Sequence, residues 1–196
     1  MGGPKGAQTR RAVLDAAIGR FGRDGFAATS VADIARDASI GGTVAYAYFP
    51  NKEALFVAAV DEDAAAVIRE GLSSVLDDPD ATDWRQTLVF TLVEAVEHHP
   101  LARRLLAGAE PGVADRVLEI PALADLRKAC AERLRAEQLT GTVRPDIDPA
   151  VIANGVVAII LSLLMSVIQL GRDATLVYAR DVAAVFAAAL EPTRPG

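Results

Sequence analysis

Apolar residues recur along most of the chain at intervals of three and four positions, the spacing that places them on one face of an α-helix. No segment carries a convincing strand pattern. We therefore predict an all-α protein, preceded by a flexible arm over residues 1–8, where glycines and a proline oppose early helix formation. Residues 110–121 are expected to be irregular or a short helix. The nine expected helices lie at residues 9–22, 30–38, 42–49, 52–76, 83–97, 100–107, 121–138, 149–170 and 175–190.

The second and third of these helices form a pair joined by a tight turn. Ser30 is suited to cap the first of the two, and Asp33 three residues later completes a capping box. The apolar residues of that helix share one face, which needs a partner to bury it. In the other helix Ala45, Tyr48 and Phe49 are expected to face inward. The positions expected to face outward are Gly42, Thr43, Tyr46 and Ala47.

An outer surface of small residues and one phenol offers little to protein packing. A helix in the major groove of DNA, in contrast, needs small residues where its backbone approaches the base edges, and hydroxyls that reach bases and phosphates. Lys52 begins the next helix, a position where its ammonium and the free backbone amides can meet a phosphate. The pattern favours a helix-turn-helix over about residues 30–49, with an ordinary packed helical hairpin as the alternative.

A longer set of residues at fixed spacing in the first quarter of the chain carries a family resemblance. These residues are Gly25, Phe26, Thr29, Ser30, Val31, Asp33, Ile34, Ala35, Tyr46, Tyr48, Phe49, Lys52, Glu53 and Leu55. Together they resemble the tetracycline-repressor (TetR) family of transcriptional regulators. The chain departs from that family at residues 41–45, where Gly41 replaces the common serine, so the recognition helix lacks the usual hydroxyl cap.

The resemblance implies an N-terminal three-helix helix-turn-helix DNA-binding domain followed by a C-terminal helical bundle for dimerisation and ligand binding. On this chain the two domains would span residues 9–52 and 53–196. The residues implied to contact DNA are Thr29, Ser30, Gly41, Gly42, Thr43, Val44, Tyr46, Tyr48 and Lys52.

The net charge of −6 argues at first against a nucleic-acid partner, but its distribution is uneven. Residues 1–53 contain seven Lys or Arg and five Asp or Glu, a net charge of +2, which leaves −8 for the remainder. A mildly basic amino end on an acidic body suits a protein that presents one end to DNA, because the body is repelled by phosphates.

Catalysis and metal binding find no support in the sequence. The two histidines, His98 and His99, are adjacent and diverge around a helix, so helix-end capping or surface exposure is the better interpretation. Cys130 is the single cysteine, which excludes an intrachain disulfide, and we expect a small buried thiol. No phosphate loop or nucleophile elbow is present. We therefore predict no enzyme activity, no cofactor and no metal, and cytoplasmic residence as the default.

The helix predicted at residues 149–170 is the most apolar in the chain. Between Gly155 and Ile168 its polar side chains are only Ser162 and Ser166, which raises the possibility of a membrane span. Burial by its own subunit on one side and by a second copy on the other explains the same run, and we favour that interpretation. By resemblance, this helix and the one at 175–190 would form a four-helix dimer interface.

The sequence therefore predicts a homodimeric, ligand-responsive transcriptional regulator, a repressor released from double-stranded operator DNA by a small, apolar effector. The alternative is a constitutive or protein-regulated DNA-binding dimer without an effector, and sequence does not separate a repressor from an activator. Residues on the helices that enclose such pockets in relatives also suit ordinary core packing. These candidates for ligand binding are Trp84, Phe90, Leu126, Cys130, Asn154 and Met165.

Overall fold

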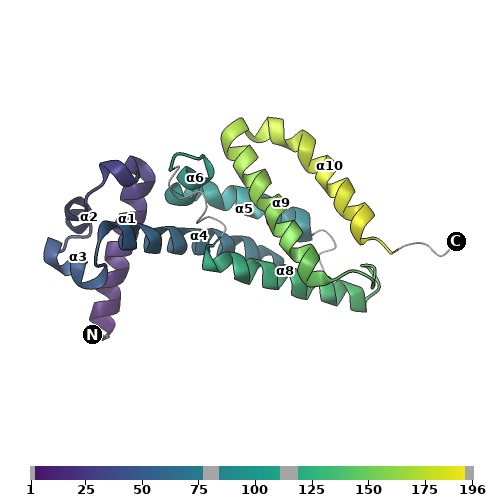
Figure 1. Ribbon diagram of the computed structural model, residues 1–196, viewed down its shortest axis with the longest axis horizontal. Coiled ribbons are helices and arrows are strands. Elements are labelled where there is room, and N and C mark those ends of the chain that lie inside the picture. The colour runs from purple at the N-terminus through teal and green to yellow at the C-terminus, as the bar shows by residue number, and fades with distance from the viewer. Residues whose placement is uncertain (1–2, 77–83, 111–118, 193–196) are drawn as a thin grey trace. The chain divides into compact units, whose positions relative to one another are not determined.

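The computed structural model describes residues 3–76, 84–110 and 119–192, with only the backbone described at 74–76, 172 and 174–180. In this part of the chain all regular structure is helical, as predicted, with nine α-helices and no strand (Figure 1). The helices are α1 (Pro4–Ala28), α2 (Val31–Asp37), α3 (Gly42–Tyr48), α4 (Lys52–Leu76), α5 (Trp84–His98), α6 (Pro100–Leu106), α8 (Pro121–Leu139), α9 (Pro149–Leu170) and α10 (Arg172–Leu190).

Helix α1 is longer than predicted at both ends. It begins at Pro4, because proline's fixed φ suits the first helical positions, so the predicted arm is helical from that residue on. It also continues past Gly22 to Ala28, with one non-helical residue at Gly25 (φ 82°). Gly22 does not end the helix but lets α6 approach it, since a Cβ there would lie 2.7 Å from the Cβ of Pro100.

The other boundaries follow the sequence more closely. Helix α9 spans the predicted range, and Asp148 caps it by accepting a hydrogen bond from the backbone N–H of Ala150 at 2.8 Å. Helix α10 begins at Arg172, three residues before the predicted start. The predicted start of the fifth helix, at residue 83, and most of the stretch between α6 and α8 lie outside the described residues.

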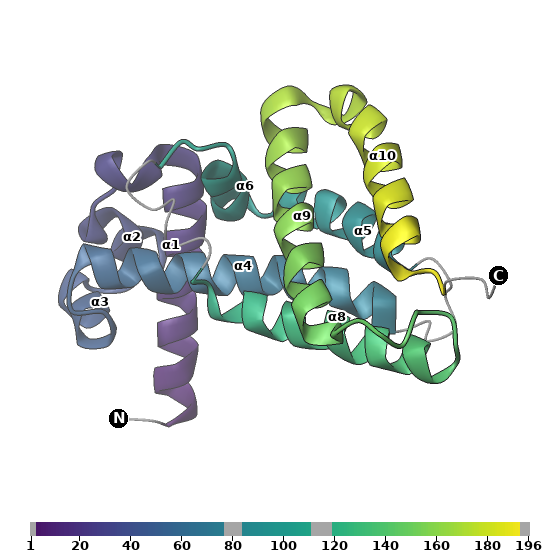
Figure 2. The ribbon, with the colours of Figure 1, turned by 45° about the vertical axis from the view of Figure 1, so that its right-hand side comes forward.

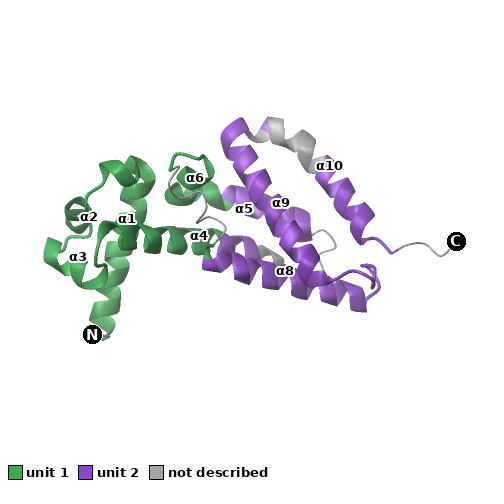
Figure 3. Cartoon of the chain, viewed as in Figure 1, with its two compact units in different colours: residues 1–67, 95–120 green, residues 68–94, 121–196 purple. Residues whose placement is uncertain are grey.

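The chain divides into two compact units (Figure 3). Unit 1 comprises Met1–Val67 and Ala95–Ile120, and unit 2 comprises Ile68–Glu94 and Pro121–Gly196. Helices α4 and α5 each contribute to both units. Helix α6 packs on α1, so a segment more than seventy residues downstream of α1 belongs to the same unit.

The core of unit 1 contains three aromatic rings. Phe21 and Phe26 each meet the ring of Phe56 edge-on, with centroids 5.0 Å apart in both pairs. Val13, Leu14 and Ala17 of α1 are buried. Leu101 of α6, in the same unit, is fully buried as well. These contacts give α1 the partner that its periodicity requires.

A buried carboxylate joins α4 to the beginning of α6. Asp63 is 3% exposed, and its Oδ2 accepts hydrogen bonds from the backbone N–H groups of Leu101 and Ala102 at 3.1 and 2.8 Å. Its other oxygen lies 2.7 Å from Nδ1 of His99. Asp63 therefore satisfies free amides of the first turn of α6, a task that no residue of α6 itself performs with a side-chain cap.

In unit 2, α9 packs on α8 and α10 packs on α9 (Figure 2). The apolar edge of α8, formed by Leu123, Leu126, Cys130 and Leu134, is buried, as the helical spacing of apolar residues predicts. Leu88 and Leu92 of α5 are buried as well. Glu137 of α8 accepts a hydrogen bond from the indole Nε1 of Trp84 at 2.7 Å and also pairs with Arg85. The carboxylate thus holds the first turn of α5 against α8.

Candidate nucleic-acid interface

The α2–α3 pair has the geometry of a helix-turn-helix. Ser30 caps α2 as predicted, because its Oγ accepts the backbone N–H of Asp33 at 3.1 Å and donates to that residue's Oδ2 at 2.6 Å. This hydrogen bond is the main reason that the pKa of Asp33 is lowered. In the turn, the residue with positive φ is Ser39 (φ 56°) rather than a glycine. Gly41 is the N-cap of α3 and provides no side-chain hydrogen bond, as its residue type predicts.

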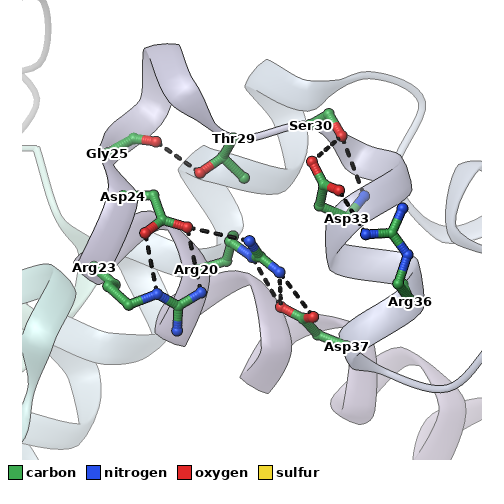
Figure 4. A network of polar contacts seen from close by, with 9 residues as sticks. All are labelled: Arg20, Arg23, Asp24, Gly25, Thr29, Ser30, Asp33, Arg36 and Asp37. Carbon is green, nitrogen blue, oxygen red and sulfur yellow. Dashed lines mark hydrogen bonds and ion pairs between the residues drawn. The ribbon is translucent and has the colours of Figure 1, made fainter.

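An ion pair that the sequence analysis missed fixes α2 on α1 (Figure 4). Arg20 donates from Nε and Nη2 to the two carboxylate oxygens of Asp37, both at 2.8 Å, in a bidentate arrangement. These hydrogen bonds hold the pKa of Asp37 below its ordinary value of 3.8. Arg20 also contacts Asp24, whose pKa is lowered chiefly by its hydrogen bonds with Arg23.

The outer face of α3 is open to solvent, as predicted. Tyr46 is 53% exposed and Val44 is 39% exposed, while Thr43 and Ala47 are also exposed. Ala45 and Phe49 are buried, and Tyr48 is half-buried. The helix is therefore anchored by its inner face while its outer side chains have no partner within unit 1 to bury them.

The two glycines at the start of α3 have ordinary backbone conformations. Gly41 has φ −69° and ψ 142°, and a Cβ there would meet only Val44, at 3.8 Å. A Cβ at Gly42 would meet nothing within 4 Å. The fold of the chain itself therefore does not require glycine at either position, and both leave the start of α3 without a side chain.

Thr29, which the resemblance implied as a DNA contact, has a structural role. It is 3% exposed, and its hydroxyl donates a 2.7 Å hydrogen bond to the carbonyl of Gly25. This bond closes the end of α1 beside the kinked residue (Figure 4). Ser30, the next residue, is exposed.

The cations of the first 53 residues fall into two groups. Arg11, Arg20, Arg23 and Arg36 each pair with a carboxylate. The cations with no carboxylate within ion-pair distance, among the described residues, are Lys5, Arg10 and Lys52.

Aromatic rings hold two of the unpaired cations in place. The guanidinium of Arg10 lies 5.1 Å from the centroid of the Phe49 ring, and Nζ of Lys52 lies 4.3 Å from that of Phe26. A ring fixes a cation without neutralising its charge, so both groups remain able to attract a phosphate.

The candidate ligand-binding residues do not all lie together. Trp84, Leu126 and Cys130 are each 1% exposed in unit 2, and burial raises the pKa of the Cys130 thiol to about 11, which keeps it protonated and unreactive. Phe90 and Met165 are 50% and 42% exposed. The last of the candidates, Asn154, is also at the surface of the single chain.

A small hollow lies in unit 1 beside Asp63, with a volume of about 230 Å³. His98 and His99 line it together with the Arg11–Glu62 ion pair, which spans α1 and α4 at 2.8 Å. His98 is exposed, as predicted for a helix end, whereas the link of His99 to Asp63 was not predicted. Among the described residues there is no group of three or more His, Cys, Asp or Glu able to hold a metal ion.

A family model places this helix-turn-helix among known proteins. The model described as "Bacterial regulatory proteins, tetR family" matches residues 13–59, from the middle of α1 into α4. Residues 13–59 therefore belong to the tetR family. The TetR-type match covers α2 and α3 completely, so the helices that the pattern singles out are the ones that the family model describes.

Matches to individual proteins extend well beyond the helix-turn-helix and agree with this assignment. The A-factor receptor protein of Streptomyces griseus is 32% identical over 155 residues, which are 79% of this chain but only 53% of that protein, so the chain spans about half its length. An HTH-type transcriptional repressor of Mycobacterium tuberculosis is 28% identical over 85% of this chain and 86% of its own. In fold, the chain is similar to the crystal structure of a regulator from Mesorhizobium loti assigned to the TetR family, with a TM-score of 0.74, 21% identity and coverage of 96% and 100%.

Proposed function

We propose that the chain is a homodimeric transcriptional repressor that binds operator DNA through α3 and is released by a small apolar effector. The observation that carries this proposal is the outer face of α3: Thr43, Val44 and Tyr46 are exposed at the point where the tetR family model matches. Two such helices, one from each subunit, would enter the major groove of half-sites about 34 Å apart or a multiple of that distance. The chain would act in the cytoplasm, where its DNA is.

The unpaired cations support the same surface. Arg10 and Lys52 lie on aromatic rings in unit 1, and neither forms an ion pair with a carboxylate among the described residues. Phosphate contacts of this kind supply affinity and position the protein, while side chains on α3 supply the choice of sequence. We also propose that the DNA-binding domain spans residues 9–52 and that the domain for dimerisation and ligand binding spans residues 53–196.

Selection from random duplex DNA tests the proposal. We expect wild-type chain to enrich a palindromic sequence, and Tyr46→Ala to bind that sequence at least about tenfold more weakly, because an exposed phenol at the centre of α3 is lost. Circular dichroism and the oligomeric state should be unchanged, since Tyr46 is not part of the core. No enrichment by the wild type, or equal affinity of the variant, would contradict the role given to α3.

Regulation by a ligand is the second part of the proposal. The A-factor receptor protein is a receptor by name, and the candidate residues Trp84, Leu126 and Cys130 lie buried in unit 2 of this chain. An effector acts only through the difference between its affinities for the DNA-binding and the released conformation. The remaining candidates are Phe90, Asn154 and Met165, which would join such a site only in a different conformation or in the dimer.

Trp84 is the single tryptophan of the chain, so it reports on this site directly. We expect a lipophilic effector, with A-factor as the first compound screened, to raise the melting temperature and to change Trp84 fluorescence over the same concentration range. Compounds that raise the melting temperature should also weaken operator binding. If no lipophilic compound does either, the chain is a constitutive or protein-regulated DNA-binding dimer.

We infer regulation rather than catalysis as the role of the chain. Of the two relatives described above, one is named a receptor and the other a repressor. Burial keeps the chain's single thiol protonated. The histidine pair is accounted for by a surface position and by the hydrogen bond to Asp63. Neither group has the activated nucleophile and base that covalent catalysis requires.

A further inference from the structure

The face that α3 offers to a DNA groove carries no charge and no amide side chain. From Ala38 to Pro50 the sequence contains no Asp, Glu, Lys, Arg, His, Asn or Gln. The nearest amide, on Asn51, is already engaged, because its Oδ1 accepts the backbone N–H of Ala54 at 2.7 Å and so caps α4. The exposed side chains available to read bases are Thr43, Val44, Tyr46 and Ala47.

This composition removes the strongest base-reading contacts. Guanine is usually read by a bidentate Arg or Lys, and adenine by a bidentate Asn or Gln. The nearby cations are committed elsewhere: Arg36 pairs with Asp33 at 3.0 Å, and Lys52 lies on the ring of Phe26. Arg10 lies over the ring of Phe49, a residue of the buried face.

What remains is apolar contact. In the major groove only one of the four bases presents a methyl group, the C5-methyl of thymine, and apolar side chains contact it. Val44 exposes 39% of its surface although it lies in a helix whose other face is buried, so its branched apolar side chain is accessible from outside. Thr43 adds a methyl group. Gly41 and Gly42 leave the start of the helix without side chains, which allows its backbone to come close to the base edges.

Resting on the proposed DNA-binding function, we propose that α3 selects its half-site by thymine methyl groups, which Val44 and the methyl of Thr43 contact in the major groove. The phenol of Tyr46 donates and accepts hydrogen bonds, so it adds affinity without separating one base from another. The half-site core read by α3 is therefore rich in A·T pairs, and its thymines are recognised without a bidentate hydrogen bond.

Deoxyuridine provides the test, because it lacks only the C5-methyl of thymidine and keeps the same pairing edge. Each dT of the selected half-site is replaced by dU in turn, and affinity is measured for wild type, Val44→Ala and Thr43→Ser. We expect at least one position at which dU weakens wild-type binding about fourfold, the effect of exposing one buried methyl. In the variant that has lost the contacting methyl, dT and dU should bind alike.

Arg10→Ala is the matched control. Its guanidinium is assigned to phosphate, so the variant should weaken binding to every duplex and leave the ratio between dT and dU unchanged. All three substituted positions are exposed, and circular dichroism checks that each variant is folded.

The outcomes separate this inference from the function on which it rests. Failure of wild-type chain to select any duplex overturns the proposed function. Selection of a duplex whose core is G·C, or equal affinity for dT and dU at every position, overturns the methyl readout while DNA binding stands. A dU effect that survives unchanged in both variants overturns the assignment to Val44 and Thr43.

Discussion

At the residue scale, one ion pair decides how the helix-turn-helix sits on α1. Arg20 and Asp37 are 17 residues apart and meet through two parallel hydrogen bonds of 2.8 Å. A bidentate pair fixes orientation as well as distance, because the planar guanidinium must lie in the plane of the carboxylate. The direction in which α2 presents its outer face therefore depends on a contact with α1 at the end of α2.

Replacing Asp37 by Asn should destabilise the protein in a pH-dependent way. The pKa of this carboxyl is lower in the folded chain than its ordinary value of 3.8, so the pair stabilises the fold above that value, and the stabilisation is lost as pH falls through the folded-state pKa. We expect the urea midpoint of Asp37→Asn, followed by circular dichroism, to lie below that of wild type at about pH 7 and to converge with it at about pH 2.

The control for this experiment is Asp125→Asn, which removes an exposed carboxylate on α8. Its urea midpoint should follow wild type at both pH values. A gap between Asp37→Asn and wild type that is equally large at about pH 2 would mean that the substitution acts through packing rather than through the charge of the carboxylate.

At the scale of elements, the helices were predictable because their apolar residues repeat with the period of the helix itself. The buried edges of α2, α8 and α9 follow directly from that period. The start of α1 was not predictable in the same way. The glycines around Pro4 indicated a flexible arm, although proline is also common in the first turn of a helix. The burial of Thr29 was not predicted for the same reason: its partner, the carbonyl of Gly25, is in reach only because α1 extends to that point.

The outer face of α3 was predictable for residues such as Tyr46, since amphipathic spacing separates an outer from an inner side. Contacts between distant segments were not. Asp63 lies 38 residues from Leu101, and nothing near either residue in the sequence distinguishes a buried helix cap from one more surface carboxylate on α4. Periodicity assigns a residue to a face, but it does not say which remote backbone groups that face meets.

Asp63→Ala should therefore cost far more stability than an ordinary surface substitution. It leaves the backbone amides of Leu101 and Ala102 without their acceptor in a buried position, which should lower the free energy of unfolding by about 3 kcal/mol. The measurement is urea denaturation at neutral pH.

Glu62→Ala, at the adjacent position, is the matched control. Its carboxylate pairs with Arg11 at the surface, so the loss should stay below about 1 kcal/mol. Equal effects of the two substitutions would show that the amides of α6 do not depend on Asp63.

At the scale of the whole molecule, α9 has one apolar face that is buried and a second face that is exposed in the single chain. One face is buried in unit 2, with Val156, Ile160 and Leu164 among its residues. The helix is also, among the described residues, the one long and apolar enough to cross a membrane, with a mean hydropathy of 2.6. Six of its exposed positions repeat at alternating intervals of four and three, the spacing of a helix that packs along a partner helix. These positions are Val151, Gly155, Ala158, Ser162, Met165 and Gln169.

This stripe, defined by those six residues, is where we expect the second subunit to bind. Leu163, which the apolar run alone would have suggested as a probe of the dimer, is 8% exposed, so Leu163→Asp would disturb the interior of unit 2 instead. Ser162→Arg places a charge at the centre of the stripe without entering that interior. It should raise the dissociation constant of the dimer at least about 100-fold, because an unpaired charge would be buried on association.

Sedimentation equilibrium at micromolar concentration measures this change, and Ala136→Arg, at an exposed position of α8, is its control. A folded monomer for Ser162→Arg and a dimer for the control are expected, together with loss of operator binding, since one half-site alone gives little affinity. A dimer that survives Ser162→Arg would place the interface elsewhere. Recovery of wild-type chain only in the membrane fraction would instead mean that the stripe contacts lipid. The proposed dimer, and with it the binding of two half-sites, would then be contradicted.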